Sequence, residues 1–128
     1  MTGSGSYLVG LDNGGTANKF TVMDRDGEFL LDELVELPSR VTEGPTAAIE
    51  ALGAAFTAAI ELAGIARRDV LGVGFDTPGP ATAHGVISSR GGTNFAHEDW
   101  KGYDFRTALE HELGLPVVYN NDGNAAAL

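Results

Sequence analysis

Residues 11–19, Leu-Asp-Asn-Gly-Gly-Thr-Ala-Asn-Lys, bring together groups that suit phosphate chemistry. Gly14 and Gly15 let backbone N–H groups approach a ligand closely, and a nest of such groups binds phosphate. Thr16 and Lys19 add a hydroxyl and an ammonium group, and Asp12 suits a hydrated Mg²⁺, which takes one or two carboxylates plus phosphate oxygens. Taken alone, however, the segment is more simply a β-hairpin with an Asn-Gly turn.

Two further polar segments follow apolar runs. Residues 76–79, Asp-Thr-Pro-Gly, follow the run that begins at Val70, and residues 121–124, Asn-Asp-Gly-Asn, follow residues 117–119. Ligands of open α/β sheets bind at the carboxyl ends of parallel strands, so these segments and residues 12–16 are expected to converge on one crevice. Asp122 suits a helix N-cap or a general base for a substrate hydroxyl, and both roles are filled if Asn121 caps the helix and Asp122 reaches the ligand. Asp76 is more simply a turn former than a second site carboxylate.

The elements that position these segments follow from periodicity and from start and stop signals. Pro45 suits a first helical position, Gly64 and Gly114 suit helix ends, and Asp104 suits an N-cap. The expected order is strands over 7–11, 17–24 and 28–37, a helix over 45–63, a strand over 70–75, a helix over 105–113, a strand over 117–119 and a helix from 122. Residues 81–99 read as a loop with a short hairpin near 85–87. The 128 residues therefore form one α/β domain.

Composition excludes several classes of protein. The net charge of −10 would repel a nucleic-acid backbone or an anionic membrane, since only Arg67 and Arg68 are adjacent basic residues. The absence of cysteine excludes disulfides and thiolate metal sites from this span. No signal peptide is expected, and no segment is expected to span a membrane. These features predict a cytoplasmic protein.

The motifs occur in an order that resembles the ROK family (repressors, open reading frames and sugar kinases). Residues 12–16 resemble its D-x-G-G-T phosphate motif, and Gly72-Val73-Gly74 with Pro78-Gly79-Pro80 resembles its strand and sugar loop. Asn94 followed by Trp100 is similar to N-L-P-G-W, and residues 121–126 are similar to N-D-x-N-A-A. The resemblance spans essentially the whole chain.

This resemblance implies an actin-like ATPase, or ribonuclease-H-like, fold with βββαβαβα order and a mixed sheet flanked by helices. It implies ATP-dependent phosphorylation of a hexose or N-acylhexosamine, with Asp122 as the base on the sugar hydroxyl. The implied sugar contacts are Gly79, Asn94, Asn121 and Asp122. The residues implied to face the ATP phosphates are Gly14, Gly15 and Thr16, with Asp12 near Mg²⁺.

Two departures and one missing half qualify the resemblance. Residues 94–100 are longer and more acidic than N-L-P-G-W, and Asp76 stands where the family carries a small or apolar residue. The family's C-terminal lobe supplies the adenosine pocket and, in many members, a Cys/His zinc site. Residues 1–128 are therefore expected to be an N-terminal lobe, inactive alone and prone to self-association or homo-oligomerisation.

Two alternatives use the same loops. One is a ribonuclease-H-like nuclease with two metals on Asp12, Asp76 and Asp122, which the acidic charge disfavours. The other is a sugar sensor of the ROK type without catalysis.

Overall fold

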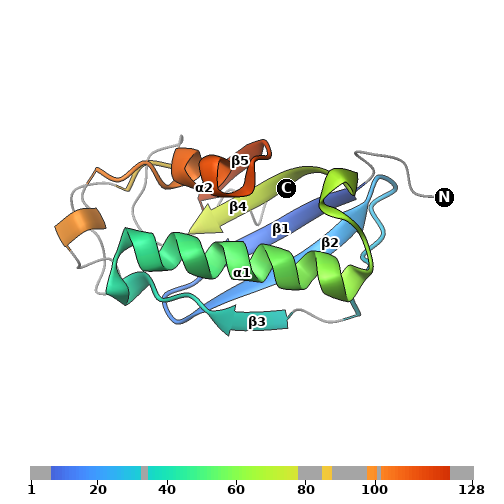
Figure 1. The fold of residues 1–128 in the computed structure, drawn as a ribbon, viewed down its shortest axis with the longest axis horizontal. Helices are drawn as coiled ribbons and strands as arrows, with labels where there is room; N and C mark the ends of the chain where they lie inside the picture. Colours follow the sequence, from blue (N-terminus) through green and yellow to red (C-terminus); the bar gives the residue numbers. More distant parts are fainter. Residues whose placement is uncertain (1–6, 33–34, 78–84, 88–97, 101, 122–128) are drawn as a thin grey trace.

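A five-stranded mixed sheet forms the centre of the computed structural model, which describes residues 7–32, 35–77, 85–87, 98–100 and 102–121 (Figure 1). The strand order is β3-β2-β1-β4-β5. Strands β1, β2 and β3 are antiparallel neighbours, whereas β4 and β5 run parallel to β1. The strands are β1 (Tyr7–Asn13), β2 (Ala17–Asp24), β3 (Val35–Pro38), β4 (Val70–Thr77) and β5 (Val117–Asn121).

Two helices begin and end where the sequence predicts. Helix α1 (Pro45–Ala63) has Pro45 in its first turn and ends at Gly64, whose φ of 72° is left-handed. Helix α2 (Phe105–Leu113) begins at Asp104, whose side chain accepts a hydrogen bond from the Thr107 N–H at 3.0 Å. Short 3₁₀ turns complete the described elements: η1 (Val41–Glu43), η2 (Arg67–Asp69) and η4 (Glu98–Trp100).

Both helices pack on one face of the sheet, and the core lies between them and the strands (Figure 1). Every second residue of each central strand points into this core, as the period of two requires. The inward side chains, all buried, are Val9, Leu11, Phe20, Val22, Val73, Phe75, Val117 and Tyr119. Trp100 is also buried and donates its Nε1 hydrogen to the Val41 carbonyl at 2.7 Å, so it is a core residue.

The structure corrects the expected bounds of four strands. The third strand, predicted over 28–37, exists but begins only at Val35, and the Asp24 carboxylate closes a turn ahead of it by accepting hydrogen bonds from the N–H groups of Asp26 and Glu28. Among residues 28–32, which the structure describes, Phe29 bridges back to Met23, and β3 begins at Val35. Strands β1, β4 and β5 each continue two residues further than expected, because the β1–β4 ladder extends to the Asp12–Asp76 pair and the β4–β5 ladder to the Thr77–Asn121 pair.

The hairpin expected near residues 85–87 stays a prediction, because residues 78–84 and 88–97 lie outside the described part of the chain. Val86 forms an isolated antiparallel bridge with Asp104, at the start of α2, so this segment pairs with a distant part of the chain. The Ile87 N–H donates to the Tyr103 carbonyl at 2.8 Å, and Ile87 is buried. The segment therefore closes the core beside α2.

Helix α1 corrects the expectation that no segment could span a membrane. Its 19 residues are long and apolar enough to cross a membrane, judged by length and composition alone. A core helix of a globular domain meets the same criterion, and the apolar stripe of α1 packs on β1, β2 and β3. The stripe therefore has a sufficient explanation in the core of this domain.

Candidate functional site

The carboxyl ends of β1, β4 and β5 lie side by side at one edge of the sheet. Asp12 is the register partner of Asp76 across the parallel β1–β4 pair, and Asp76 is the partner of Asn120 on β5. On the other side of β1, Asp12 is the partner of Lys19. A row of polar residues therefore crosses the end of the sheet, which is where open α/β sheets bind ligands.

The first loop at this edge, residues 14–16, is a tight hairpin connection between β1 and β2. The Gly14 N–H donates to the Ala17 carbonyl at 2.9 Å, and the Thr16 carbonyl accepts from the Ser39 N–H at 3.1 Å. The Gly14 N–H is thus committed within the loop, and the contact of Gly14 with phosphate stays a prediction. The side chains of Asp12, Thr16 and Lys19 are exposed.

Glycine is required at position 14 because the Ala17 carbonyl oxygen approaches it closely, and not because its φ is left-handed. A Cβ atom built on Gly14 would lie 2.6 Å from the Ala17 carbonyl oxygen, well inside van der Waals contact. Any side chain at this position would push the hairpin open. The glycine expected from the phosphate motif is therefore explained by the geometry of the loop, whether or not phosphate binds there.

A cluster of buried polar side chains supports this loop from the core side. Asn13 and Asn18 are opposite each other in the ladder, and the Asn13 Nδ2 donates to the Asn18 Oδ1 at 2.7 Å. Both side chains and that of Ser39 are fully buried, and each has a polar atom without a partner among the described residues. Unpaired buried polar atoms are costly, and a buried water or a neighbouring polar group commonly satisfies them.

The sequence interpretation missed this cluster, although the alternation carries a signal for it. Asn13 continues the inward positions of Val9 and Leu11, and Asn18 precedes Phe20 on the inward face of β2. The Asn-Gly pair, a common hairpin turn, predicted instead that Asn13 belongs to the loop. The alternation of inward and outward side chains along β1 and β2 therefore places the amides of Asn13 and Asn18 in the core.

The end of β4 carries two different side chains. Asp76 is half-buried and lies within the strand, so the prediction that it forms a turn is wrong. Thr77 is fully buried and its Oγ1 lies 2.7 Å from the Tyr119 hydroxyl on β5. This hydroxyl pair joins β4 to β5 directly below the edge.

Several predicted site residues lie outside the described part of the chain. Gly79, Asn94 and Asp122 are among them. The backbone of Asn121 ends β5 as the partner of Thr77, but its side chain is not described. Within the described segments no group of three or more His, Cys, Asp or Glu side chains could hold a metal ion.

Comparison with known proteins gives this edge a context. The chain matches the model of the ROK family over residues 8–128. The glucokinase of Streptomyces coelicolor is 32% identical over 120 residues, which are 93% of this chain and 33% of that protein. The chain thus spans about a third of the length of the curated relatives that it matches.

Solved structures agree in fold. The ROK hexokinase from Thermus thermophilus superposes with a TM-score of 0.76 at 34% identity, covering 94% of this chain and 37% of that one. A ROK family glucokinase from Streptomyces griseus, in complex with glucose and AMPPNP, gives 0.70 at 29% identity over 94% of this chain and 35% of that one. The predicted fold class, an actin-like ATPase domain with a mixed sheet and flanking helices, is confirmed.

Proposed function

The chain belongs to the ROK family, and from this premise we propose that its complete protein is an ATP-dependent sugar kinase. The relatives named above are a glucokinase and a hexokinase, and the glucokinase structure from Streptomyces griseus contains a sugar and an ATP analogue. One observation in this chain carries the proposal: the ends of β1, β4 and β5 meet at one edge. The three predicted motifs begin there. The nuclease alternative has no comparable support.

The proposed reaction transfers the γ-phosphoryl group of ATP to a hydroxyl of a hexose or N-acylhexosamine. The sugar hydroxyl oxygen attacks the γ-phosphorus of ATP, and its proton passes to the Asp122 carboxylate. The bond between the γ-phosphorus and the oxygen that bridges it to the β-phosphate breaks, and ADP leaves with that oxygen. Gly79, Asn94 and Asn121 are proposed to hold sugar hydroxyls and so to aim the reacting oxygen.

The loop of residues 14–16 is proposed to face the phosphates. The Thr16 hydroxyl and Lys19 ammonium group are exposed, and the short loop keeps the backbone compact beside them. Asp12 is an exposed carboxylate whose backbone neighbour is Asp76, and such oxygen donors fit a hydrated Mg²⁺. When bound there with ATP, Mg²⁺ would neutralise phosphate charge.

The proposed roles are tested by replacing the base. In the complete protein, Asp122→Asn should lower kcat for sugar-dependent ADP release by roughly 10²- to 10⁴-fold, while sugar binding measured by calorimetry persists. Asp26→Asn is the matched control, because Asp26 is exposed in the turn after β2. Near-normal turnover of Asp122→Asn would contradict the proposal.

Two further results would separate the alternatives. A panel of glucose, mannose and N-acetylmannosamine would identify the sugar, and binding without ADP release in every case would favour the sugar sensor. Residues 1–128 alone should show no kinase activity, because the complete relatives are about three times as long.

A further inference from the structure

A buried hydrogen bond between two amides closes the base of the loop of residues 14–16. Asn13 is the last residue of β1, and Asn18 is the second residue of β2. The Asn13 Nδ2 donates to the Asn18 Oδ1 at 2.7 Å, and both side chains are fully buried. Asn13 occupies the position that the D-x-G-G-T motif leaves unspecified, and Asn18 follows the motif. The phosphate motif therefore does not account for the two amides.

The amide pair interrupts an apolar row on the core face of the sheet. Asn13 and Asn18 are opposite each other in the β1–β2 ladder, and alternation places them on the inward face. Asparagine is depleted in strands, where apolar and β-branched residues are common. The two preceding inward pairs of this ladder are apolar and buried: Val9 with Val22, and Leu11 with Phe20.

Stability does not explain this change from apolar to polar side chains. The Asn13 Oδ1 and the Asn18 Nδ2 are buried without a hydrogen-bond partner in the described segments. An unpaired buried polar atom generally costs more free energy than one hydrogen bond contributes, and a buried water that satisfied it would lose freedom of its own. Two leucines, which have the same branching and number of side-chain heavy atoms, would continue the apolar row without this cost. The pair therefore serves something other than stability.

The hydrogen bond provides a fixed position for the loop. Apolar contact has no preferred direction, whereas a hydrogen bond weakens steeply when its geometry changes. The bond between Asn13 and Asn18 joins β1 to β2 where the loop leaves one strand and enters the other. On its other side the loop is held by the Ser39 N–H, which donates to the Thr16 carbonyl at 3.1 Å. The loop is thus tied to β1, to β2 and to the chain that follows β3.

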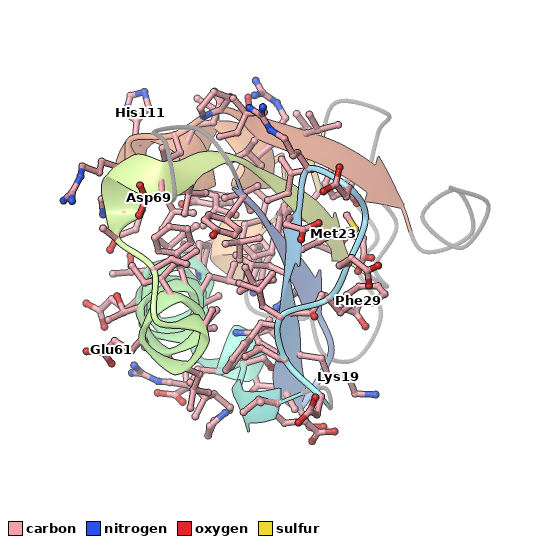
Figure 2. All side chains as sticks on the ribbon, turned by 90° about the vertical axis from the view of Figure 1, so that its right-hand side faces the viewer. Lys19, Met23, Phe29, Glu61, Asp69 and His111 are labelled. Carbon is pink, nitrogen blue, oxygen red and sulfur yellow. The ribbon has the colours of Figure 1, made fainter. Side chains whose placement is uncertain are left out.

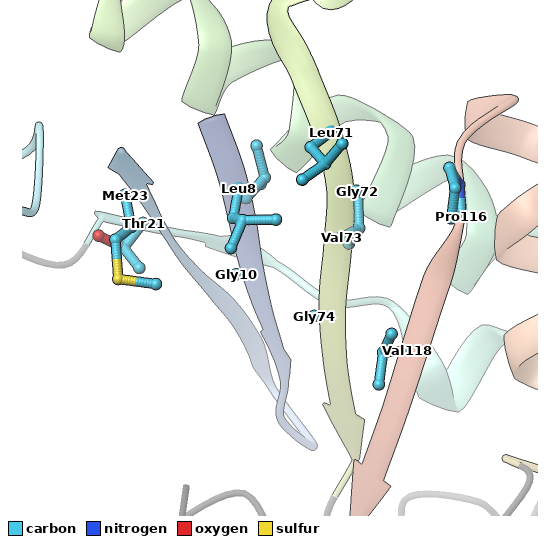
Figure 3. Close-up of a pocket in the computed structure, with 11 residues that line it drawn as sticks. Leu8, Gly10, Thr21, Met23, Leu71, Gly72, Val73, Gly74, Pro116 and Val118 are labelled. Atoms are coloured by element: carbon cyan, nitrogen blue, oxygen red, sulfur yellow. The ribbon is translucent and has the colours of Figure 1, made fainter. Parts of the chain in front are cut away.

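The charged groups proposed to meet Mg²⁺ and ATP stand on the opposite face of the same two strands. Figure 2 shows Lys19 on the side of the sheet away from α1. Asp12 and Lys19 are opposite each other in the ladder, and each is the chain neighbour of one buried amide. Figure 3 shows the same face further from the loop, with the preceding outward residues of this alternation: Leu8 and Gly10 on β1, and Thr21 and Met23 on β2.

We propose that Asn13 and Asn18 are positioning residues for phosphoryl transfer. Their hydrogen bond fixes the backbone beside Asp12 and Lys19, and so fixes the carboxylate and the ammonium group proposed for Mg²⁺ and phosphate. Neither amide touches the nucleotide, since both are buried on the core face. What binds at the loop rests on the proposed function, whereas what holds the loop rests on the described contacts alone. Displacing reacting groups by about 1 Å can cost roughly 10²-fold in rate, so a loosened loop should lower activity.

Replacing both amides separates positioning from stability. In the complete protein, Asn13→Leu with Asn18→Leu removes both partners, so neither amide stays buried alone. The midpoint of thermal unfolding should stay within about 2 °C of the wild type or rise. The dissociation constant of AMPPNP with Mg²⁺, measured by calorimetry, should rise about tenfold, and kcat/KM for ATP should fall at least as much. The dissociation constant of the panel sugar that the wild type binds most tightly should stay within about twofold.

Two results would overturn the positioning role. A folded double variant with the AMPPNP affinity and kcat/KM of the wild type would show that the loop does not need the amides. A midpoint more than about 5 °C lower would show that the amides serve stability after all. If the leucine pair does not fold, Asn13→Val with Asn18→Val replaces it with the same expectations, because valine is smaller and suits strands. If neither pair folds, the amides are needed for folding and the proposal is overturned.

Val9→Ala is the matched control, because Val9 lies on the same inward row but away from the loop. It should lower the midpoint by about 3 °C or more by leaving a cavity, while the AMPPNP dissociation constant stays within about twofold. A tenfold rise in this control would show that lost stability alone weakens nucleotide binding, and would overturn the proposal.

The wild type distinguishes failure of this inference from failure of the proposed function. A wild type that binds AMPPNP but phosphorylates no sugar contradicts the kinase assignment, and the AMPPNP comparison still tests the amides. A wild-type kinase whose double variant is unchanged overturns the positioning role alone. A wild type that neither binds AMPPNP nor phosphorylates a sugar overturns both.

Discussion

The sharpest test of the phosphate-motif hairpin is Gly14→Ala. The added Cβ would lie 2.6 Å from the Ala17 carbonyl oxygen, whereas real Cβ contacts are at least 3.0 Å, and ordinary ones exceed 3.4 Å. The two atoms must therefore separate by about 0.4 to 0.8 Å. The same carbonyl is the acceptor for the Gly14 N–H at 2.9 Å, so this separation strains or breaks that hydrogen bond.

The cost has two parts. Loss of the hydrogen bond removes about 1 kcal/mol, and residual distortion of bond angles adds about 1 kcal/mol. We expect Gly14→Ala to lower the free energy of unfolding of residues 1–128 by about 2 kcal/mol. With a urea m-value of about 2 kcal/mol per molar, the midpoint falls by about 1 M.

Gly74→Ala is the matched control in the same 128 residues. Its Cβ meets nothing within 4 Å, so its free energy of unfolding should stay within about 0.5 kcal/mol of the wild type. If the two variants unfold at the same urea concentration, the close approach at Gly14 does not govern the hairpin and the reasoning fails. In the complete protein, Gly14→Ala should also raise KM for ATP more than KM for the sugar.

Three other predictions concern the core and its support. Leu52→Ala, at a fully buried position of α1, should cost about 2–5 kcal/mol in urea unfolding, and a cost below 1 kcal/mol would argue against that packing. Trp100→Phe removes the donor to the Val41 carbonyl and should cost about 2 kcal/mol by thermal unfolding; a neutral result would mean that this hydrogen bond adds nothing. The Val117 N–H donates to Glu110 at 3.0 Å and holds the pKa of Glu110 below its ordinary value. The stability advantage of wild type over Glu110→Gln should thus be full above about pH 5 and shrink as pH falls through the lowered pKa. An advantage that grows in acid would refute it.

Local signals made the helices predictable from the sequence. Two residues mark where the helices begin, Pro45 and Asp104, and two mark where they end, Gly64 and Gly114. Each acts within one helical turn, so its effect does not depend on distant contacts. The alternation of β2 likewise follows from its own residues. These elements were correct to the residue or nearly so.

Strand ends were less predictable, because a neighbouring strand decides them. Asp76 reads as a turn residue, yet it stays in β4 because Asp12 and Asn120 flank it in the ladder. The strand expected over 28–37 begins only at Val35 for the converse reason: the Asp24 carboxylate accepts hydrogen bonds from the N–H groups of Asp26 and Glu28, and these bonds compete with strand pairing. Such competition depends on side-chain geometry, which the hydrophobic periodicity of the sequence does not reveal.

The candidate site was predictable in position rather than in detail. The carboxyl ends of β1, β4 and β5 meet as expected from parallel strands. The use of the Gly14 N–H within its own loop was not predicted, since it depends on a loop of only three residues. The roles of Gly79, Asn94, Asn121 and Asp122 stay predictions.

The buried pair of Asn13 and Asn18 limits how this hairpin can change in evolution. Inserting or deleting one residue between them would turn one of the two amides outward and leave its partner alone in the core. Substitutions at residues 15 and 16 carry no such cost. The connection is therefore fixed in length and, at Gly14, in residue type, so a ligand at its tip would meet the side chains of residues 15 and 16 at a constant distance from the end of β1.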